Sequence, residues 1–503
     1  MVSSPSPSLR DASTEVRFAV FGGPVRSLVA TCSPVLMSLL LAVVAWGDCA
    51  VVRAEAGGGL PLDLATRPQG QDWPVFLGPT ADGKSVETGL QTPWPDQGPR
   101  LLWQRELGES YGIGSVSRGR YLQFDYADGK ARLDCWNAET GQPIWNFSYT
   151  SGYTDYYGYN SGPRASPVVD GDRVYLLGVE GMLHCVRLED GQLIWKVNTQ
   201  ERFQVVQNFF GVGSSPVVFE DLLLVMVGGS PKEDLSLPPN RFDEVSPQGS
   251  AIVAFDKRTG EVRYQTLDDL ASYATPRIVQ QGGRPWAFAF CRDGLGAFDP
   301  RNGQVDFRLP WRARILESVN ASTPVVWNDR VFISETYGPG AALLAFKPGG
   351  FETIWSDETR GRGKAMQTHW NTPIYHEGFL YGSSGRHTGN AELRCIEAET
   401  GRVRWSIPDL SRCSLTYLDG HFLCLSETGT LRLVRANPEK YELVSEFTPR
   451  LAGQGADPGT ADESARPLLA YPAWAAPIVA RGLMYVRGKD RVACYEIIPQ
   501  QDP

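Results

Sequence analysis

Eight polar and aromatic residues could together form a binding site. Each lies shortly before an expected strand, in most cases one that opens on Ser-Pro, Thr-Pro or Ala-Pro. Indole rings stack on planar or apolar groups, and guanidinium, imidazole and amide groups donate hydrogen bonds. These residue types favour recognition of a partner protein, a glycan or a small ligand. The eight candidates are Asn160, Arg164, Asn320, His369, Trp370, Asn371, Arg412 and Trp474.

Residues for catalysis or metal binding are harder to find. Asp155 and Glu317 are the carboxylates nearest to the eight candidates, and we expect both to be solvated loop acids. The five histidines are scattered without the spacing of a metal site, and no C-x-x-C pair occurs. The sequence therefore nominates no catalytic residue and no metal ligand.

The elements that would position these residues follow from a repeated phrase. It reads L-D-C-W-N-A-E-T-G-Q-P-I-W at 133–145 and L-R-C-I-E-A-E-T-G-R-V-R-W at 393–405. Most copies are separated by the 40–50 residues that a four-stranded propeller blade needs. The longest interval contains a proline-rich insert, Ser230–Gln248. The final position of successive copies is Trp145, Trp195, Tyr264, Phe307, Trp355, Trp405 and, in a degenerate copy, Leu443.

A second phrase supplies the other half of each unit. Ser166-Pro167 and Thr323-Pro324 each begin an apolar pair, a polar turn and another apolar run, which is a hairpin pattern. Each unit is thus two successive hairpins, with strands A to D. The long segments connect D to A or B to C, and these connections emerge on one face of a propeller. The eight candidates are expected at the rim of this long-loop face.

The chain ends supply one further unit. Val492-Ala493-Cys494-Tyr495 resembles a strand C, and Leu101-Leu102-Trp103-Gln104 resembles the strand D that should follow it. Pairing them closes the ring and removes the open edges. We therefore predict an all-β, eight-bladed propeller of four-stranded antiparallel blades. Because the unit at 410–446 is degenerate, seven blades are the alternative.

The repeat also assigns structural roles. Cys135, Cys185, Cys395 and Cys494 occupy one repeat position, which is Ala254, Ala297 or Ala345 in other copies. A position that accepts Cys or Ala is a small-residue packing position rather than a disulfide site. The repeat aromatics, Trp103 included, are expected to pack between blades.

The phrase A-E-T-G-Q-P-I-W at Ala138–Trp145, with its copy at 398–405, resembles the tryptophan-docking repeat of pyrroloquinoline quinone (PQQ) dehydrogenases. Non-enzymatic relatives share this repeat, including an outer-membrane assembly lipoprotein. The resemblance covers about residues 100–497, and D-W-P-V-F-L-G-P-T-A-D-G at 72–83 resembles the opening of secreted bacterial PQQ-like propellers.

The resemblance implies the fold more strongly than it implies a reaction. PQQ enzymes would need Ca²⁺ with oxygen ligands and a carboxylate base. The large alcohol dehydrogenases also use adjacent cysteines, and this chain has neither a Cys-Cys pair nor a C-x-x-C-H haem motif. We expect a non-catalytic protein that scaffolds or binds, with no cofactor. The alternative is a PQQ- and calcium-dependent dehydrogenase of an alcohol or sugar.

Composition and the N-terminus suggest where the protein works. The 503 residues carry a net charge of −9 without a long basic stretch, which argues against nucleic acid. Residues 1–56 resemble a leader, with an apolar run at Val35–Trp46 and Ala54-Glu55-Ala56 as a cleavage site. Residues 57–99 would be an extension and 100–503 the propeller. We expect an exported monomer, periplasmic or secreted, that contacts a membrane only if the leader is uncleaved.

Overall fold

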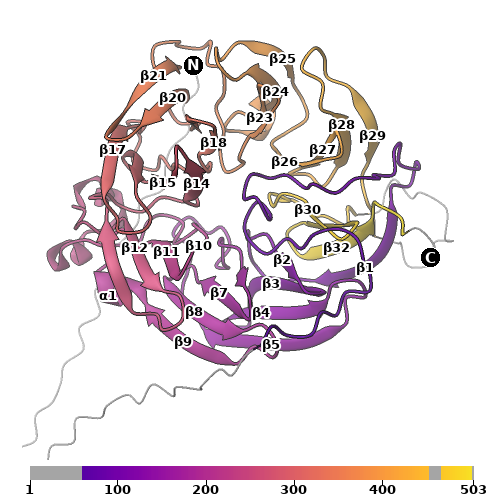
Figure 1. Cartoon of the computed structure of the whole chain (residues 1–503), viewed down its shortest axis with the longest axis horizontal. Helices are drawn as coiled ribbons and strands as arrows, with labels where there is room; N and C mark the ends of the chain where they lie inside the picture. The colour runs from indigo at the N-terminus through magenta and orange to yellow at the C-terminus, as the bar shows by residue number, and fades with distance from the viewer. Residues whose placement is uncertain (1–58, 452–465, 501–503) are drawn as a thin grey trace, which may run out of the picture. The chain divides into compact units, whose positions relative to one another are not determined.

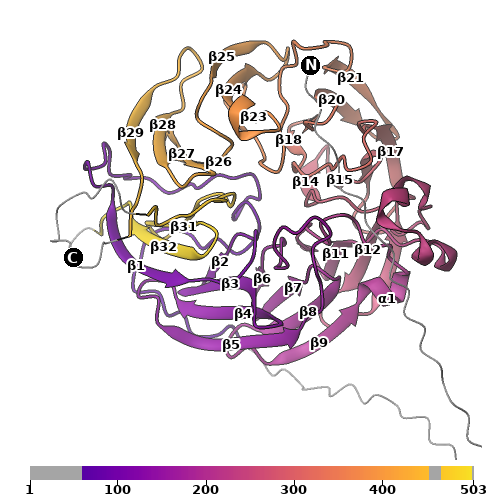
Figure 2. The same ribbon diagram turned by 180° about the vertical axis from the view of Figure 1, so that it is seen from behind.

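The computed structural model describes residues 59–451 and 466–500. Eight four-stranded antiparallel sheets surround a common centre, each running from an inner to an outer strand (Figure 1; Figure 2). The predicted eight-bladed propeller is confirmed, and the seven-bladed alternative is excluded. The leader, residues 1–56, lies outside the described residues.

The first four blades follow the chain without interruption. They are β2 (Ser115–Ser117), β3 (Arg120–Ala127), β4 (Lys130–Asn137) and β5 (Pro143–Thr150); β6 (Val168–Asp170), β7 (Arg173–Leu177), β8 (Met182–Arg187) and β9 (Leu193–Asn198); β10 (Val217–Phe219), β11 (Leu222–Met226), β12 (Ile252–Asp256) and β13 (Val262–Thr266); and β14 (Arg277–Gln281), β15 (Arg284–Phe290), β16 (Gly294–Phe298) and β17 (Val305–Pro310).

The next three blades are also continuous, and the eighth combines both ends of the chain. They are β18 (Val325–Trp327), β19 (Arg330–Ser334), β20 (Ala341–Lys347) and β21 (Gly350–Ser356); β22 (Ile374–His376), β23 (Phe379–Ser384), β24 (Glu392–Glu397) and β25 (Val403–Ile407); β26 (Cys413–Leu418), β27 (His421–Ser426), β28 (Leu431–Arg435) and β29 (Leu443–Phe447); and β30 (Ile478–Ala480), β31 (Leu483–Arg487), β32 (Arg491–Glu496) and β1 (Arg100–Glu106).

Helices are confined to loops in the part of the chain that is described. They are α1 (Thr199–Phe203) and the 3₁₀ turns η1 (Lys232–Ser236), η2 (Pro239–Glu244) and η3 (Thr388–Asn390). Within residues 59–451 and 466–500, none of them has the length and apolar character needed to cross a bilayer.

The eighth blade closes the ring as predicted. β1 pairs antiparallel with β32, and Trp103 lies opposite Cys494 in this register. The same opposition recurs in the first blade, where Trp145 lies opposite Cys135. Closure of this kind gives the eighth blade its outer strand and completes the ring.

The repeat tryptophans pack onto the following blade. The indole Nε1 of Trp103 donates to the carbonyl of Ala138 at 2.9 Å, in the turn between β4 and β5. A Cβ at Gly141, in the same turn, would lie 2.7 Å from the Trp103 ring, so this glycine provides the space for the ring as well as a positive φ of 68°. Equivalent bonds join Trp145 to Leu188, Trp195 to Lys257, Trp355 to Ala398 and Trp405 to Asn437.

The sequence prediction of two repeat positions is wrong by two residues. In β20 the residue opposite Trp355 is Leu343, whereas Ala345 lies opposite Glu352. In the seventh blade the residue at the aromatic position is Ser445, opposite Leu433, and not Leu443. Every outer strand pair carries a β-bulge beside this position, and a bulge shifts the register without any mark in the apolar pattern.

The seven cysteines of the described residues are buried and free. Cys135, Cys185, Cys395 and Cys494 are each 0% exposed within the blade core. The packing role predicted for this position is therefore confirmed.

The segment before β1 crosses the middle of the ring. Trp73 exchanges backbone hydrogen bonds with Val116 of the first blade, and Ser85 donates to the carbonyl of Tyr417 in the seventh. Between them, Arg277 of the fourth blade donates to the carbonyls of residues 80 and 81. Both views show this indigo segment running from the rim to the centre (Figure 1; Figure 2). Residues 73–85 are named the plug below.

Candidate functional site

A cavity of about 610 Å³ opens at the centre of the ring, within the range typical of small-molecule sites. Its walls come from the segments that precede the first strand of several blades, and Phe76 and Leu77 of the plug also line it. Six of the eight sequence candidates line the cavity: Arg164, His369, Trp370, Asn371, Arg412 and Trp474. Asn160 and Asn320 do not.

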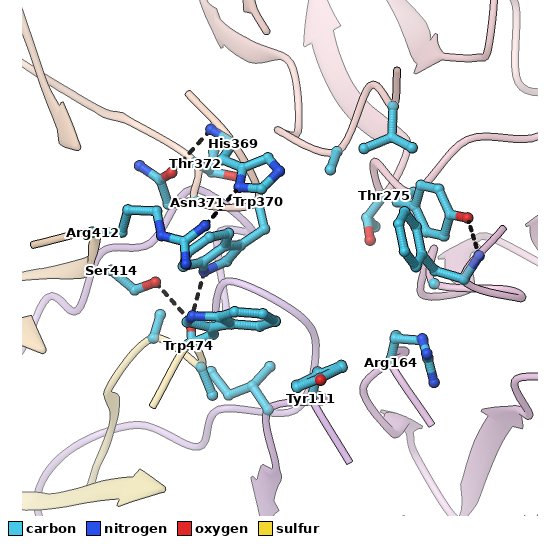
Figure 3. A pocket seen from close by; sticks show the side chains of 18 of the residues that line it. Tyr111, Arg164, Thr275, His369, Trp370, Asn371, Thr372, Arg412, Ser414 and Trp474 are labelled. Carbon is cyan, nitrogen blue, oxygen red and sulfur yellow. Dashed lines mark hydrogen bonds between the residues drawn. The ribbon is translucent and has the colours of Figure 1, made fainter. Parts of the chain in front are cut away.

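One wall is a stack of indoles and a guanidinium (Figure 3). The rings of Trp370 and Trp474 lie with centroids 4.5 Å apart, and Tyr111 lies 4.8 Å beyond Trp474. The Arg412 guanidinium is 4.3 Å from the Trp370 ring and 5.5 Å from the Trp474 ring. Cation–π contact and close packing therefore hold this wall in one arrangement.

A buried carboxylate fixes the guanidinium. Glu427, whose side chain is 0% exposed, accepts from Arg412 Nη2 at 2.7 Å and from Arg412 Nε at 3.0 Å. It also accepts from the indole Nε1 of Trp474 at 3.0 Å. Burial opposes ionisation of Glu427, but the hydrogen bonds from Arg412 and Trp474 outweigh it and hold its pKa below the ordinary value.

His369 completes the wall as a neutral ring. Arg412 Nη1 lies 3.2 Å from His369 Nδ1, and because a guanidinium can only donate, Nδ1 is the acceptor. The proton is then on Nε2, which lies 2.9 Å from the hydroxyl of Tyr337. Burial first, and then the charges of Arg412 and Arg386, lower the pKa of His369 to about 3.

Arg164 is neutralised on the other side of the cavity. Its Nη2 lies 2.7 Å from Asp155 Oδ2, and its guanidinium lies 5.5 Å from the Tyr111 ring. The Asp155 side chain is only 1% exposed, so the expectation that Asp155 is a solvated loop acid is wrong. Arg164, rather than water, balances the charge of this carboxylate.

The wall opposite the indoles is mostly tyrosine and phenylalanine. The backbone N–H of Phe210 donates to the Tyr273 hydroxyl at 2.9 Å. Tyr157 lies 5.6 Å from the Phe210 ring and donates its hydroxyl proton to Glu317 at 3.3 Å. Glu317 is half-buried at the edge of the cavity.

The three asparagine candidates make structural bonds. Asn320 donates to the carbonyls of Cys291 and Trp311 at 2.8 and 3.0 Å, and it is buried. Asn371 lines the cavity, but its amide donates to the Ser383 carbonyl at 2.9 Å. Asn160 accepts from the backbone of its own loop. Nothing in this arrangement tests whether any of the eight candidates binds a ligand, which stays a prediction.

Sequence reasoning missed Glu427, although a signal for it exists. Leu425-Ser426-Glu427-Thr428 and Ile333-Ser334-Glu335-Thr336 repeat the same S-E-T phrase at the end of the second strand of two blades. Glu335 is also buried and accepts backbone N–H groups of residues 337, 338 and 340. A buried acid at a repeated strand end indicates a fixed polar partner.

The donor set does not fit the calcium-bound quinone that the resemblance suggests. Calcium takes six to eight oxygen ligands from several side chains. No three His, Cys, Asp or Glu side chains gather as a metal site in residues 59–451 and 466–500. Glu427 and Asp155 are each committed to an arginine, and the amide of Asn371 to a carbonyl.

Fold and cavity together define a closed PQQ-like β-propeller with a binding-sized hollow at its centre. The family model described as outer membrane protein assembly factor BamB matches residues 157–407. The chain therefore belongs to the PQQ-like β-propeller family. No curated protein matches the sequence.

Solved structures share the fold at low identity. BamB from Moraxella catarrhalis is 12% identical with a TM-score of 0.51, covering 80% of this chain and 99% of that one. Quinohemoprotein alcohol dehydrogenase from Comamonas testosteroni is 13% identical with a TM-score of 0.46, covering 86% and 81%. The computationally designed Ika8 protein has a TM-score of 0.47 at 11% identity, covering 79% and 98%. Likeness at these identities concerns the fold alone.

Proposed function

We propose that the chain is an exported, non-catalytic propeller that binds its partner in the central cavity. The carrying observation is that the cavity has aromatic walls while its ionisable groups are largely tied to one another. Trp370, Trp474 and Tyr111 line the hollow with apolar aromatic surface, which is what a ligand-binding wall needs. The occupant is a small ligand, or a projecting part of a protein or glycan.

The pairing of the polar groups argues for binding rather than proton transfer. A general base needs a free lone pair and a pKa near the working pH. The Nδ1 lone pair of His369 already accepts from the guanidinium of Arg412 at 3.2 Å, so protonation there would place two buried cations in contact. Glu427 is likewise bound by Arg412 and Trp474. His369 and Glu427 thus each hold a neighbouring side chain in place.

The test is binding of 8-anilinonaphthalene-1-sulfonate, a fluorescent aromatic probe, to the full chain and three variants. Trp370→Ala and Trp474→Ala remove the indole wall, and each should weaken saturable binding by about tenfold or more, the loss of one buried aromatic contact. Trp327→Ala is the matched control, because Trp327 stacks on Tyr375 at 4.2 Å and does not line the cavity. Equal affinity in all four proteins would contradict the proposal.

The dehydrogenase alternative has its own test. PQQ and Ca²⁺ are added to the purified protein, excess is removed, and the quinone absorbance that remains is measured. We expect no stoichiometric retention, because Glu427 and Asp155 are committed to arginines, and Glu317 alone cannot supply the several oxygen ligands that calcium takes. Tightly held quinone together with dye reduction would favour the dehydrogenase instead.

Export is proposed from the leader composition. The arginines at 10, 17 and 26 precede the apolar run, and a small-residue site follows it. Mass spectrometry of the mature protein should find Gly57 as the first residue. A chain that retains residue 1 and remains inside the cell would contradict this.

A further inference from the structure

Among the described residues that line the cavity, one cation and one anion have no ion-pair partner. Its charged lining residues are Arg164, Glu317, Arg386 and Arg412. Arg164 is paired with Asp155, and Arg412 with Glu427. Among the described residues, no carboxylate lies within 4.0 Å of Arg386 and no basic group within 4.0 Å of Glu317. Both are half-buried, so water serves them less well than it serves a surface charge.

The two free charges belong to different walls. Arg386 lies over the Tyr337 ring at 4.5 Å, and its backbone carbonyl accepts from Arg412 Nη1 at 3.0 Å. It therefore belongs to the wall of the indole stack. Glu317 accepts from Tyr157, which packs on Phe210 of the facing wall. Figure 3 shows open space between the labelled Trp370 and Trp474 on one side and Thr275 on the other.

Each free charge has a tyrosine beside it that suits the opposite charge. Because His369 Nε2 donates to the Tyr337 hydroxyl, the Tyr337 proton is available to a further acceptor next to Arg386. The Tyr157 ring beside Glu317 offers a π face to a cation. One end of the cavity thus presents donors, and the other presents an acceptor with aromatic surface.

We propose that the cavity takes a small zwitterion, with its anionic group at Arg386, its cationic group at Glu317 and an apolar body against Trp370 and Trp474. This inference rests on the proposed function, since it names the ligand of the same cavity. A ligand of one charge would leave either Arg386 or Glu317 desolvated without a partner, which is the unfavourable case. A zwitterion satisfies both and leaves the internal pairs intact.

The test uses isothermal titration calorimetry of the full chain with two zwitterions. The first is a series of peptides of alternating Phe and Gly, two to five residues long, with free ends, N-acetylated, C-amidated or doubly capped. The second is phosphocholine, which carries a quaternary ammonium and a phosphate on a smaller body. At least one zwitterion should bind. If it is a peptide, each single cap should weaken binding by about tenfold or more.

Variants assign the two ends. Glu317→Gln should abolish the penalty of N-acetylation but keep that of C-amidation, and Arg386→Gln should do the reverse. For phosphocholine, Glu317→Gln should weaken binding relative to that of free phosphate, and Arg386→Gln should weaken it relative to that of free choline. Glu439→Gln, at an exposed ion pair with Arg404, is the control and should change nothing.

The outcomes separate this inference from the proposed function. If the anilinonaphthalene probe binds but neither zwitterion does, or if caps cost nothing, the zwitterion is wrong and the cavity remains a binding site. The zwitterion is likewise wrong if Glu317→Gln and Arg386→Gln both abolish the penalty of the same cap. If neither the zwitterions nor the aromatic probe bind, the proposed function itself fails.

Discussion

The buried pair of Arg412 and Glu427 gives the sharpest stability prediction. Glu427→Gln keeps the shape of the side chain but removes its charge, leaving a guanidinium that is 10% exposed without a counter-ion. Uncompensated charges of this kind cost about 3–5 kcal/mol. The amide also brings a donor toward the Nε1 donor of Trp474. We expect the free energy of unfolding at pH 7 to fall by about 3–5 kcal/mol.

Urea unfolding of the full chain, followed by tryptophan fluorescence and circular dichroism together, measures the change. Glu439→Gln is the control, since Glu439 is 71% exposed in its pair with Arg404 and exposed pairs contribute about 0–1 kcal/mol. The double variant Arg412→Met/Glu427→Leu should recover most of the loss, because it leaves no unpaired charge. A Glu427→Gln loss no larger than that of the control would refute the reasoning.

The same pair has a defined pH dependence. The pKa of Glu427 is lowered in the folded state, so its contribution is fully present above the unfolded value near 4.5 and is lost as pH falls through the folded pKa. The difference between the unaltered protein and Glu427→Gln should therefore shrink only below about pH 4.5. A difference that already disappears near pH 6 would mean that another group carries it.

Three further predictions concern the ring and the neutral histidine. In Gly191→Ala, the new Cβ would lie 2.6 Å from the Trp145 ring, whereas in the control Gly129→Ala, at a similar φ, it would meet nothing within 4 Å. Urea unfolding of both variants should show that Gly191→Ala lowers the free energy of unfolding by about 1–3 kcal/mol more than Gly129→Ala does. Trp103→Ala should cost about 3–5 kcal/mol and raise proteolysis at the closing blade, and resistance equal to the unaltered protein would contradict its docking role. Folding lowers the pKa of His369 from 6.5 to about 3, so below about pH 6.5 the unfolded chain binds a proton that the folded protein does not. Stability should therefore decline as pH drops below about 6.5, and His369→Gln should flatten that decline in thermal unfolding scans.

The blades could be predicted because their pattern is local. The phrase from Leu133 to Trp145 contains a strand, a turn and the start of the next strand, so the sequence alone orders them. Ring closure followed from the same phrase cut in two, with Trp103 at one end of the chain and Cys494 at the other. The predicted register was wrong at Ser445, which carries no hydrophobic signal, and opposite Trp355, where a β-bulge shifts the pairing.

The candidate site could be predicted only in part, because its contacts join segments far apart in the chain. Position before a first strand indicated Trp370 and Trp474 but could not show that their rings meet at 4.5 Å. The same rule selected Asn320, whose amide is used up by backbone carbonyls. Tyr111 lies before the first strand of the first blade too, yet no repeated phrase marked it.

The plug forms part of the cavity wall and so influences how the cavity is reached. Val116 and Tyr417, which bond to the plug, lie on the first strands of their blades, and the cavity lining combines residues that precede first strands with Ser414 and Leu415 of β26. Phe76 and Leu77 of the plug form part of the lining. Tyr159 and Tyr471 also line the hollow and are 58% and 52% exposed, so the long loops that carry them form a solvent-facing part of it. Selectivity should accordingly lie in the long loops, the segments that the repeat leaves free to vary.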